Sequence, residues 1–147
     1  MLIENIIGSA HSLHLNGKKI DIVDIDWFEV NKKILKKTSR NGKDIGFKLP
    51  HHIHLHHNDI VYIDESEAIV ISINECDAIV IRPSSMEEMG KICYEIGNKH
   101  VPLFMNGEEI AVPFDGPLMK LLEKKGFKPE KAVVRLTNGL EYHSHEH

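Results

Sequence analysis

The sequence predicts an α+β protein built from two small domains and a flexible, histidine-containing C-terminal tail. Short candidate strands separated by turn signals fill residues 1–74, which predicts an all-β small sandwich or barrel. Residues 75–137 combine strand and helix periodicities in the order β-α-β-β-α-β, which is the ferredoxin-like pattern. The joint between the domains is therefore expected near residue 74, and the tail covers residues 138–147.

The first strands of the β domain follow from apolar patterning. LIENII at 2–7 is a short apolar stretch. Residues 19–27 (KIDIVDIDW) alternate apolar and acidic side chains, with a slip at Val23. We expect a half-buried strand, bulged at the slip, with Ile20 and Ile22 in its apolar set and its aspartates facing solvent.

Two hairpins complete the β domain. Asn41-Gly42 is a strong hairpin signal, and it predicts a tight turn with positive φ at both positions. A second hairpin is expected to join 60–63 (IVYI) to 68–73 (AIVISI) through an acidic turn.

A capping box and a helical stripe predict the first helix of the second domain. After a strand at 76–82, Ser84 followed by Glu87 is expected to open a helix that runs to about Lys99. Its apolar stripe, at helical spacing, consists of Met86, Met89, Ile92, Cys93 and Ile96.

Turn signals mark the remaining elements of the second domain. Asn106-Gly107 predicts another hairpin, and PLMKLLEKK at 117–125 predicts a short helix that Gly126 ends. AVVRL at 132–136 is the last predicted strand, and the polar residues that follow it are expected to be untethered.

Charge and composition exclude several classes of protein. Eighteen basic against twenty-two acidic side chains give a formal charge of −4 with no basic stripe, which argues against nucleic acid as a partner. No apolar run reaches the roughly 20 residues of a membrane span, and no secretory signal is recognised. Two cysteines without CxxC spacing make neither a disulfide scaffold nor a zinc ribbon, so a cytoplasmic protein is expected.

Histidine is the abnormal residue type. Eleven occur, and eight of them form two clusters: His51, His52, His54, His56 and His57 in PHHIHLHHND, and His143, His145 and His147 in YHSHEH. Neighbouring neutral imidazoles chelate nickel, copper or zinc, and alternate histidines of an extended segment share one side. Metal binding is therefore the favoured interpretation, and the alternative is that both clusters are solvated loops that tolerate histidine.

His100 stands apart from both clusters. It follows the predicted helix after Gly97-Asn98, a pair that can take the left-handed conformation that turns a chain off a helix. By itself it is either a histidine favoured by the helix dipole or a partly buried polar residue, and one imidazole cannot make a metal site. A two-fold dimer with His100 near its axis would bring two imidazoles to one ion, and tail histidines could complete the shell.

The sequence contains no recognisable catalytic constellation. It has no HExxH, no GxSxG and no phosphate-binding glycine loop, and no nucleophile–base pair can be named. A metal-dependent hydrolase would need a general base beside an open coordination position, and no such base stands out. We therefore do not expect an enzyme.

Several segments together resemble a known family. The helix and its end, MEEMGKICYEIGNKH (86–100), with the terminal HSHEH, are similar to the UreE family of urease accessory proteins, the nickel metallochaperones of urease maturation. IDWFEVNKKILKKTSRNGKDIGFKL and NDIVYID extend the resemblance over nearly the whole chain. Lys99 stands where the family usually has arginine, and the histidines at 51–57 are not a feature expected of its first domain.

The resemblance implies a fold and a function. The first domain would be similar to the peptide-binding domain of Hsp40 chaperones, and the second would be a ferredoxin-like metal-binding domain. A homodimer would hold nickel between protomers through His100, with His145 and His147 first and His143 second as further ligands. Zinc and copper bind some members. The nickel would pass to a GTPase partner in the complex that activates apo-urease, without covalent catalysis. The sequence does not decide between this dimer and a metal-dependent tetramer, in which two dimers share a metal through facing histidines.

Two questions stay open at the level of the sequence. The 51–57 cluster is either a peripheral nickel or zinc reservoir or a histidine-tolerant surface loop. The whole chain could alternatively be a protein-binding module whose histidines sense pH without transferring metal.

Overall fold

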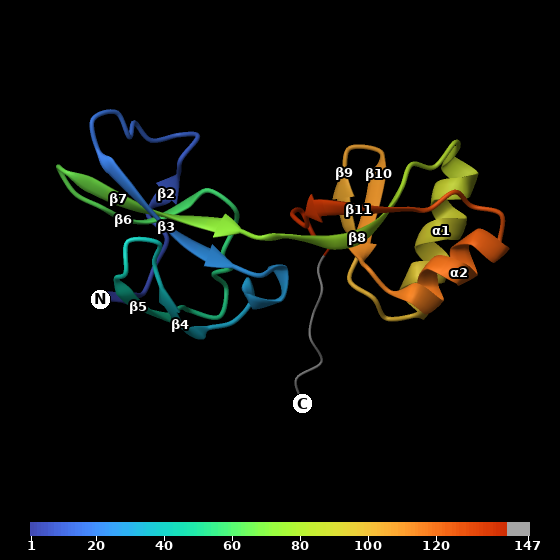
Figure 1. Cartoon of the computed structure of the whole chain (residues 1–147), viewed down its shortest axis with the longest axis horizontal. Helices are drawn as coiled ribbons and strands as arrows, with labels where there is room; N and C mark the ends of the chain where they lie inside the picture. The colour runs from blue at the N-terminus through green and yellow to red at the C-terminus, as the bar shows by residue number, and fades with distance from the viewer. Residues whose placement is uncertain (141–147) are drawn as a thin grey trace. The chain divides into compact units, whose positions relative to one another are not determined.

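The computed structural model describes residues 1–140, and the chain divides into two compact units at Asn74/Glu75. Each unit has its own sheets and its own hydrophobic core (Figure 1). Within the described residues, no helix has both the length and the apolar character needed to cross a membrane.

Seven strands and one turn of 3₁₀ helix form the first unit. They are β1 (Leu2–Ile3), β2 (Gly8–Ser9), β3 (Lys19–Ile25), η1 (Trp27–Glu29), β4 (Ile34–Thr38), β5 (Asp44–Lys48), β6 (Asp59–Ile63) and β7 (Glu67–Ile73). One sheet has the order β1-β5-β4 and the other has the order β2-β6-β7-β3. The pairs β1–β5 and β3–β7 are parallel, and the other pairs are antiparallel.

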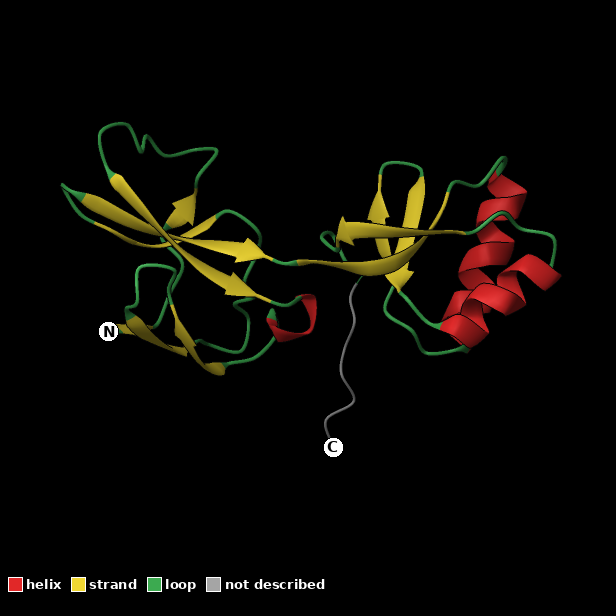
Figure 2. Cartoon of the chain, in the orientation of Figure 1, coloured by secondary structure: helices red, strands yellow, loops and turns green. Residues whose placement is uncertain are grey.

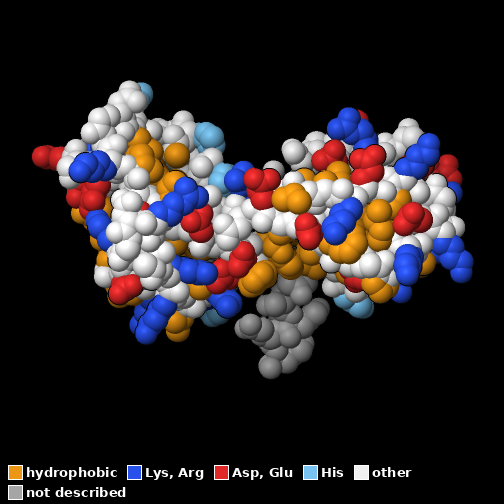
Figure 3. Space-filling view, in the orientation of Figure 1, with side chains coloured by type: hydrophobic (Ala, Val, Ile, Leu, Met, Phe, Trp, Pro, Cys, Tyr) orange, Lys and Arg blue, Asp and Glu red, His pale blue; other side chains and the backbone are white. Residues whose placement is uncertain are grey.

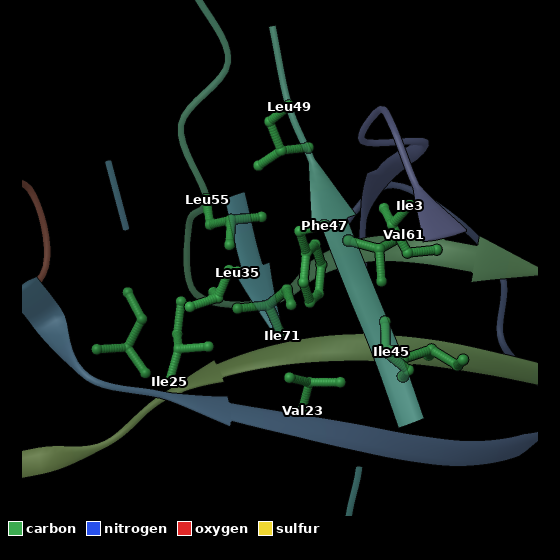
Figure 4. Close-up of a cluster of buried hydrophobic side chains, with 12 residues drawn as sticks. Ile3, Val23, Ile25, Leu35, Ile45, Phe47, Leu49, Leu55, Val61 and Ile71 are labelled. Carbon is green, nitrogen blue, oxygen red and sulfur yellow. The ribbon is translucent and has the colours of Figure 1, made fainter. Parts of the chain in front are cut away.

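A single core lies between these two sheets, so the first unit is a small β-sandwich. Figure 4 shows Ile45 and Phe47 of β5 on one side of the core, with Val23 of β3 and Ile71 of β7 on the other. All four side chains are at most 2% exposed. The predicted sandwich is confirmed, and its hairpin from β6 to β7 turns through the acidic segment as expected.

Strand β3 buries a different face from the one predicted. Val23 is fully buried together with Asp21 and Ile25, whereas Ile20 is 42% exposed. The slip at Val23 is therefore no bulge: β3 pairs with β7 without a break, and the register shift lies in β6 between Ile60 and Tyr62. The expectation that the aspartates face solvent is also wrong for Asp21.

Asp21 is buried because its side chain holds the β4–β5 loop. Its Oδ1 accepts hydrogen bonds from the backbone N–H of Ile22 (2.8 Å) and of Asn41 (3.1 Å). In that loop only Gly42 has a positive φ, of 88°, so the prediction of two positive values is wrong. The loop is instead a turn with three residues between Ser39 and Lys43, whose last residue is the left-handed glycine.

The second unit has the element order β-α-β-β-α-β, as predicted. Its elements are β8 (Glu75–Ile81), α1 (Met86–Asn98), β9 (Phe104–Asn106), β10 (Glu109–Pro113), α2 (Gly116–Lys124) and β11 (Glu130–Arg135). The sheet order is β11-β8-β10-β9, with every pair antiparallel. Both helices lie together on one side of the sheet (Figure 2), where Ile92, Ile96, Leu118 and Leu122 form the core with Ile79 and Ile110.

Helix α1 begins one residue later than the capping box predicts. Ser85 is the N-cap, and its hydroxyl accepts a hydrogen bond from the backbone N–H of Glu88 at 3.1 Å. Ser84 instead donates through its hydroxyl to the Glu88 carboxylate at 3.0 Å. Met86, which the stripe places in the core, is 90% exposed, so the buried stripe starts at Met89.

Candidate metal centre

His100 lies at the end of α1, on a segment held from both sides. Ile92 and Ile96 are fully buried, and they fix the last turns of the helix against the sheet. On the outer side, Lys125 Nζ lies 3.0 Å from Glu95 Oε1, an ion pair that joins the end of α1 to the end of α2. The exposed imidazole of His100 therefore projects from a rigid support.

The backbone of His100 is left-handed. Its φ is 56°, and its N–H donates to the carbonyl of Gly97 at 3.1 Å, which is how a residue just beyond a helix satisfies an unpaired carbonyl. Gly97 and Asn98 are both helical, so the expectation that they turn the chain off the helix is wrong. The histidine itself takes the conformation that glycine usually supplies there, at a cost of roughly 1 kcal/mol.

A basic pocket of about 340 Å³ begins at the residue next to His100. It is lined by Lys99, Lys120 and Lys124, by one acidic residue, Asp115, and by apolar residues that include Pro117 and Leu121. Three lysines against one aspartate give the pocket a net positive charge, which favours anions over cations.

The chain beyond β11 returns to the other edge of the sheet. Met105 N–H donates to the carbonyl of Asn138 at 3.3 Å, and Leu140 N–H donates to the carbonyl of Leu103 at 2.9 Å. Residues 136–140, which we call the strap, therefore run from β11 at one edge to β9 at the other. The expectation of an untethered chain does not hold for Asn138–Leu140, and the tail histidines His143, His145 and His147 lie outside the described residues.

The 51–57 segment is a loop that points its histidines to the surface. His51, His52, His54 and His56 are exposed, whereas Ile53 and Leu55 between them pack against the sandwich core. In Figure 3 the histidines of this unit show as separate small patches. The alternation predicted for this segment thus separates an exposed histidine side from a buried apolar side.

Two histidine ring nitrogens of the segment contact neighbouring groups. His57 Nδ1 accepts a hydrogen bond from the backbone N–H of Ile73 at 3.1 Å. His56 Nδ1 lies 3.5 Å from Asp59 Oδ2, and the backbone N–H of His56 donates a hydrogen bond to the same oxygen at 2.6 Å. Burial raises the pKa of the Asp59 carboxyl, and this outweighs the opposing effect of His56. These contacts support the local fold of the loop, and they involve the Nδ1 atom of each imidazole.

Within residues 1–140, no group of three or more His, Cys, Asp or Glu side chains is placed to hold a metal ion. His100 therefore offers one exposed nitrogen ligand, and a complete site needs ligands from a second chain or from residues beyond 140.

Sequence reasoning missed the residues that anchor the strap. Leu103, Phe104 and Gly139 carry no metal-binding chemistry, so no sequence motif marks them. One signal is present: Asn138-Gly139 is an Asn-Gly pair, the fourth in the chain, and Asn138 has a positive φ of 59°.

Two family models match this chain, one for each of its two units. The family model for the UreE urease accessory protein N-terminal domain matches residues 3–74, and the model for the C-terminal domain matches residues 77–147.

Individual relatives extend over nearly the full chain. The urease accessory protein UreE of Flavobacterium johnsoniae is 42% identical over 139 residues, which cover 94% of this chain and 84% of the relative. That of Acetivibrio thermocellus is 40% identical, with both chains covered completely. That of Haemophilus influenzae strain Rd is also 40% identical, covering 97% of this chain and 80% of its own. The chain belongs to the UreE family of urease accessory proteins.

Proposed function

We propose that this protein is a nickel metallochaperone that delivers Ni²⁺ to apo-urease during assembly of the urease metallocentre. The relatives are named urease accessory proteins, which supports a role in urease maturation and not an enzymatic one. The observation that carries the proposal is His100, an exposed imidazole held rigidly at the end of α1. Nickel is the cargo, and the chain itself catalyses no covalent step.

In this proposal the ion lies between two protomers of a homodimer. Each protomer contributes His100, because an isologous contact repeats every residue across the two-fold axis. His145 and His147, and then His143, supply further ligands from the tail. Met86 and Tyr94 are exposed on α1, the helix that ends just before His100, and in this proposal they contact the second protomer. Facing histidines of two dimers could hold one more ion, which would give a metal-dependent tetramer.

The basic pocket supports a site that releases its cargo. Lys99, Lys120 and Lys124 oppose a divalent cation bound nearby, so nickel at His100 would be held less tightly than by imidazoles alone. Zinc and copper would bind the same ligands, since imidazole serves all three metals. The acceptor in the proposal is the urease accessory GTPase, within the complex that activates apo-urease in the cytoplasm.

Nickel titration by calorimetry, with molar mass measured alongside, tests the site. His100→Ala should lose the tightest half-equivalent of nickel per chain, and a chain ending at Tyr142 should bind more weakly but keep that stoichiometry. His14→Ala is the matched control, because His14 is an exposed histidine of the first unit and should leave binding unchanged. Unchanged binding by His100→Ala would exclude the interfacial site.

Acid should weaken the complex, because a protonated imidazole cannot bind the ion. We expect nickel affinity to fall steadily between about pH 7.5 and pH 6, around the usual histidine pKa of about 6.5. The alternative function, a pH-sensing module that binds proteins without transferring metal, predicts pH-dependent partner affinity in chelator-treated protein. Partner affinity that requires nickel favours the carrier.

The 51–57 cluster needs a separate experiment. Four of its histidines are exposed and the described side chains do not group as metal ligands, which is consistent with a surface loop that tolerates histidine. A metal reservoir would require these side chains to move together when metal is added. Changing all five histidines to alanine and counting bound nickel per dimer distinguishes the two. A lower count would identify a reservoir for nickel or zinc, and an unchanged count would leave a surface loop.

A further inference from the structure

Three sulfur atoms lie along one side of α1, in the first half of the helix. Met86, Met89 and Cys93 follow one another at spacings of three and four residues, which at 3.6 residues per turn places them within an arc of about 60° on the helix surface. Cys93 Sγ–H donates a weak hydrogen bond to Met89 Sδ at 3.8 Å. Met86 is 90% exposed, so the core does not hold its thioether, and this flexible side chain can turn toward the other two sulfur atoms. One thiol and two thioethers can therefore meet at a single point on α1.

The distance between the two sulfur atoms in contact fits two ligands of one metal ion. Metal–sulfur bonds of about 2.3 Å, set about 120° apart around a three-coordinate ion, place neighbouring sulfur atoms about 4 Å from each other. The observed 3.8 Å between Cys93 Sγ and Met89 Sδ needs little adjustment. The helix is held firmly here, because Ile92 and Ile96 are fully buried against the sheet. Two of the three donors are thus in place before any ion binds.

Gly90 leaves the sulfur atoms accessible from solvent. It lies four residues after Met86 and three before Cys93, so it is a neighbour of both on the helix surface. A Cβ at Gly90 would meet no heavy atom within 4 Å beyond the backbone of α1 and the two adjoining residues. Met89 and Cys93 are themselves partly buried. An ion can therefore approach their sulfur atoms over Gly90.

The donor set selects a soft ion with a single charge. Thiolate and thioether ligands favour Cu(I), whereas imidazole suits Ni²⁺ and Zn²⁺. On binding, Cu(I) replaces the proton of the Cys93 thiol, which passes to solvent, and the resulting thiolate neutralises the charge of the ion. The loaded site then carries no net charge, which suits its partly buried position. A divalent ion would leave one positive charge uncompensated there.

We propose that Met86, Met89 and Cys93 form a Cu(I) site on α1 that is separate from His100. The Cys93 thiolate and the Met89 thioether carry the binding, and Met86, which is also a contact of the proposed dimer, completes the shell. The inference goes beyond the proposed function and does not depend on it. Because copper is held by sulfur alone, one chain can hold Cu(I) on α1 while its His100 remains available to nickel.

Anaerobic titration of the full chain with Cu(I), in competition with bicinchoninate, tests the site. Loss of even an outer partner of a metal ligand costs about 10–100-fold in affinity, so Met86→Leu and Met89→Leu should each weaken Cu(I) binding about tenfold or more. Leucine conserves the volume of methionine, so both variants should keep the fold. Met105→Leu in β9 and Cys76→Ala in β8 are the matched controls, since both residues lie outside α1, and they should bind as the unmodified chain does. Unchanged affinity in Met86→Leu and Met89→Leu would overturn the proposal.

X-ray absorption at the copper edge identifies the donor atoms directly. The Cu(I)-loaded chain should show sulfur neighbours at about 2.3 Å, and Cys93→Ala should lose them. Nitrogen neighbours alone would overturn the proposal, because they would place the copper on histidines. His100→Ala should keep the Cu(I) affinity and the sulfur neighbours, and a loss of either would overturn the separation of the two sites. Met89→Leu should bind nickel as the unmodified chain does, so the copper site and the proposed nickel site are tested independently.

Discussion

His100 combines an exposed imidazole with a backbone conformation that residues other than glycine rarely adopt. Its φ of 56° places it just beyond α1, where its N–H satisfies the carbonyl of Gly97. Glycine would fill this position at a lower conformational cost. Position 100 therefore carries a histidine although glycine would suit the backbone better. A role of the imidazole in binding would explain this choice.

Replacing His100 by glycine and by alanine separates backbone strain from metal binding. His100→Gly should have a free energy of unfolding about 1 kcal/mol higher than His100→Ala, because alanine retains the left-handed strain and glycine does not. Both variants should lose the tightest nickel equivalent. Urea denaturation of the metal-free proteins measures the difference, and equal stability of the two variants would show that the strain is absent in solution.

At the scale of secondary-structure elements, the turns and the helix start were harder to predict than the elements themselves. The sequence SSMEE contains two overlapping capping patterns, Ser84 with Glu87 and Ser85 with Glu88. Both patterns satisfy the capping signal equally, so the sequence alone does not decide between the two serines, and the structure has Ser85 as the N-cap.

The two serines provide a matched pair of variants. Ser85→Ala should lower the free energy of unfolding by about 1 kcal/mol, since it removes the hydroxyl that accepts from Glu88 N–H. Ser84→Ala should cost clearly less, because its hydroxyl only reaches an exposed carboxylate. Thermal or urea unfolding measures both changes. Equal costs would mean that the helix start moves between the two serines.

The β4–β5 loop is joined to β3 by a two-point ion pair, which gives a prediction on pH. Arg40 Nε and Nη2 donate to the Asp24 carboxylate at 2.9 and 2.8 Å. The hydrogen bonds from Arg40 lower the pKa of Asp24, and burial opposes them only partly. Because the pKa of Asp24 is lower in the folded than in the unfolded chain, the ion pair stabilises the fold fully at pH values above the unfolded pKa of about 4. This contribution is lost as the pH falls through the lower pKa of the folded protein.

Arg40→Met should therefore be less stable than the unmodified chain at pH 7 by less than about 1 kcal/mol, because both partners are partly exposed. The difference should shrink as the pH falls below about 4 and disappear once the pH is below the lowered pKa of Asp24 in the folded protein. Urea unfolding across this range is the measurement. A difference that persists unchanged in acid would assign the effect to packing of the Arg40 side chain.

At the scale of the whole molecule, the sequence predicts the features that depend on residues close together in the chain. The order β-α-β-β-α-β and the β6–β7 hairpin follow from local periodicity and turn signals, whereas His100 as a candidate ligand follows from the resemblance to the family. The burial of Asp21 and the return of the strap to β9 depend on contacts between segments far apart in sequence. A slip in alternation at Val23 resembled a bulge because the pattern alone does not show that β3 buries an aspartate.

The two units have separate cores, which predicts that each folds without the other. The sandwich core draws only on residues before Asn74, and the helix-covered core draws only on residues after Glu75. Chains 1–74 and 75–147 should each give dispersed amide NMR spectra, with shifts close to those of the full chain except near residue 74. Chain 75–147 contains His100 and all three tail histidines, so it should retain the tightest nickel equivalent. Loss of nickel binding in a folded 75–147 chain would show that the β-sandwich takes part in holding the ion.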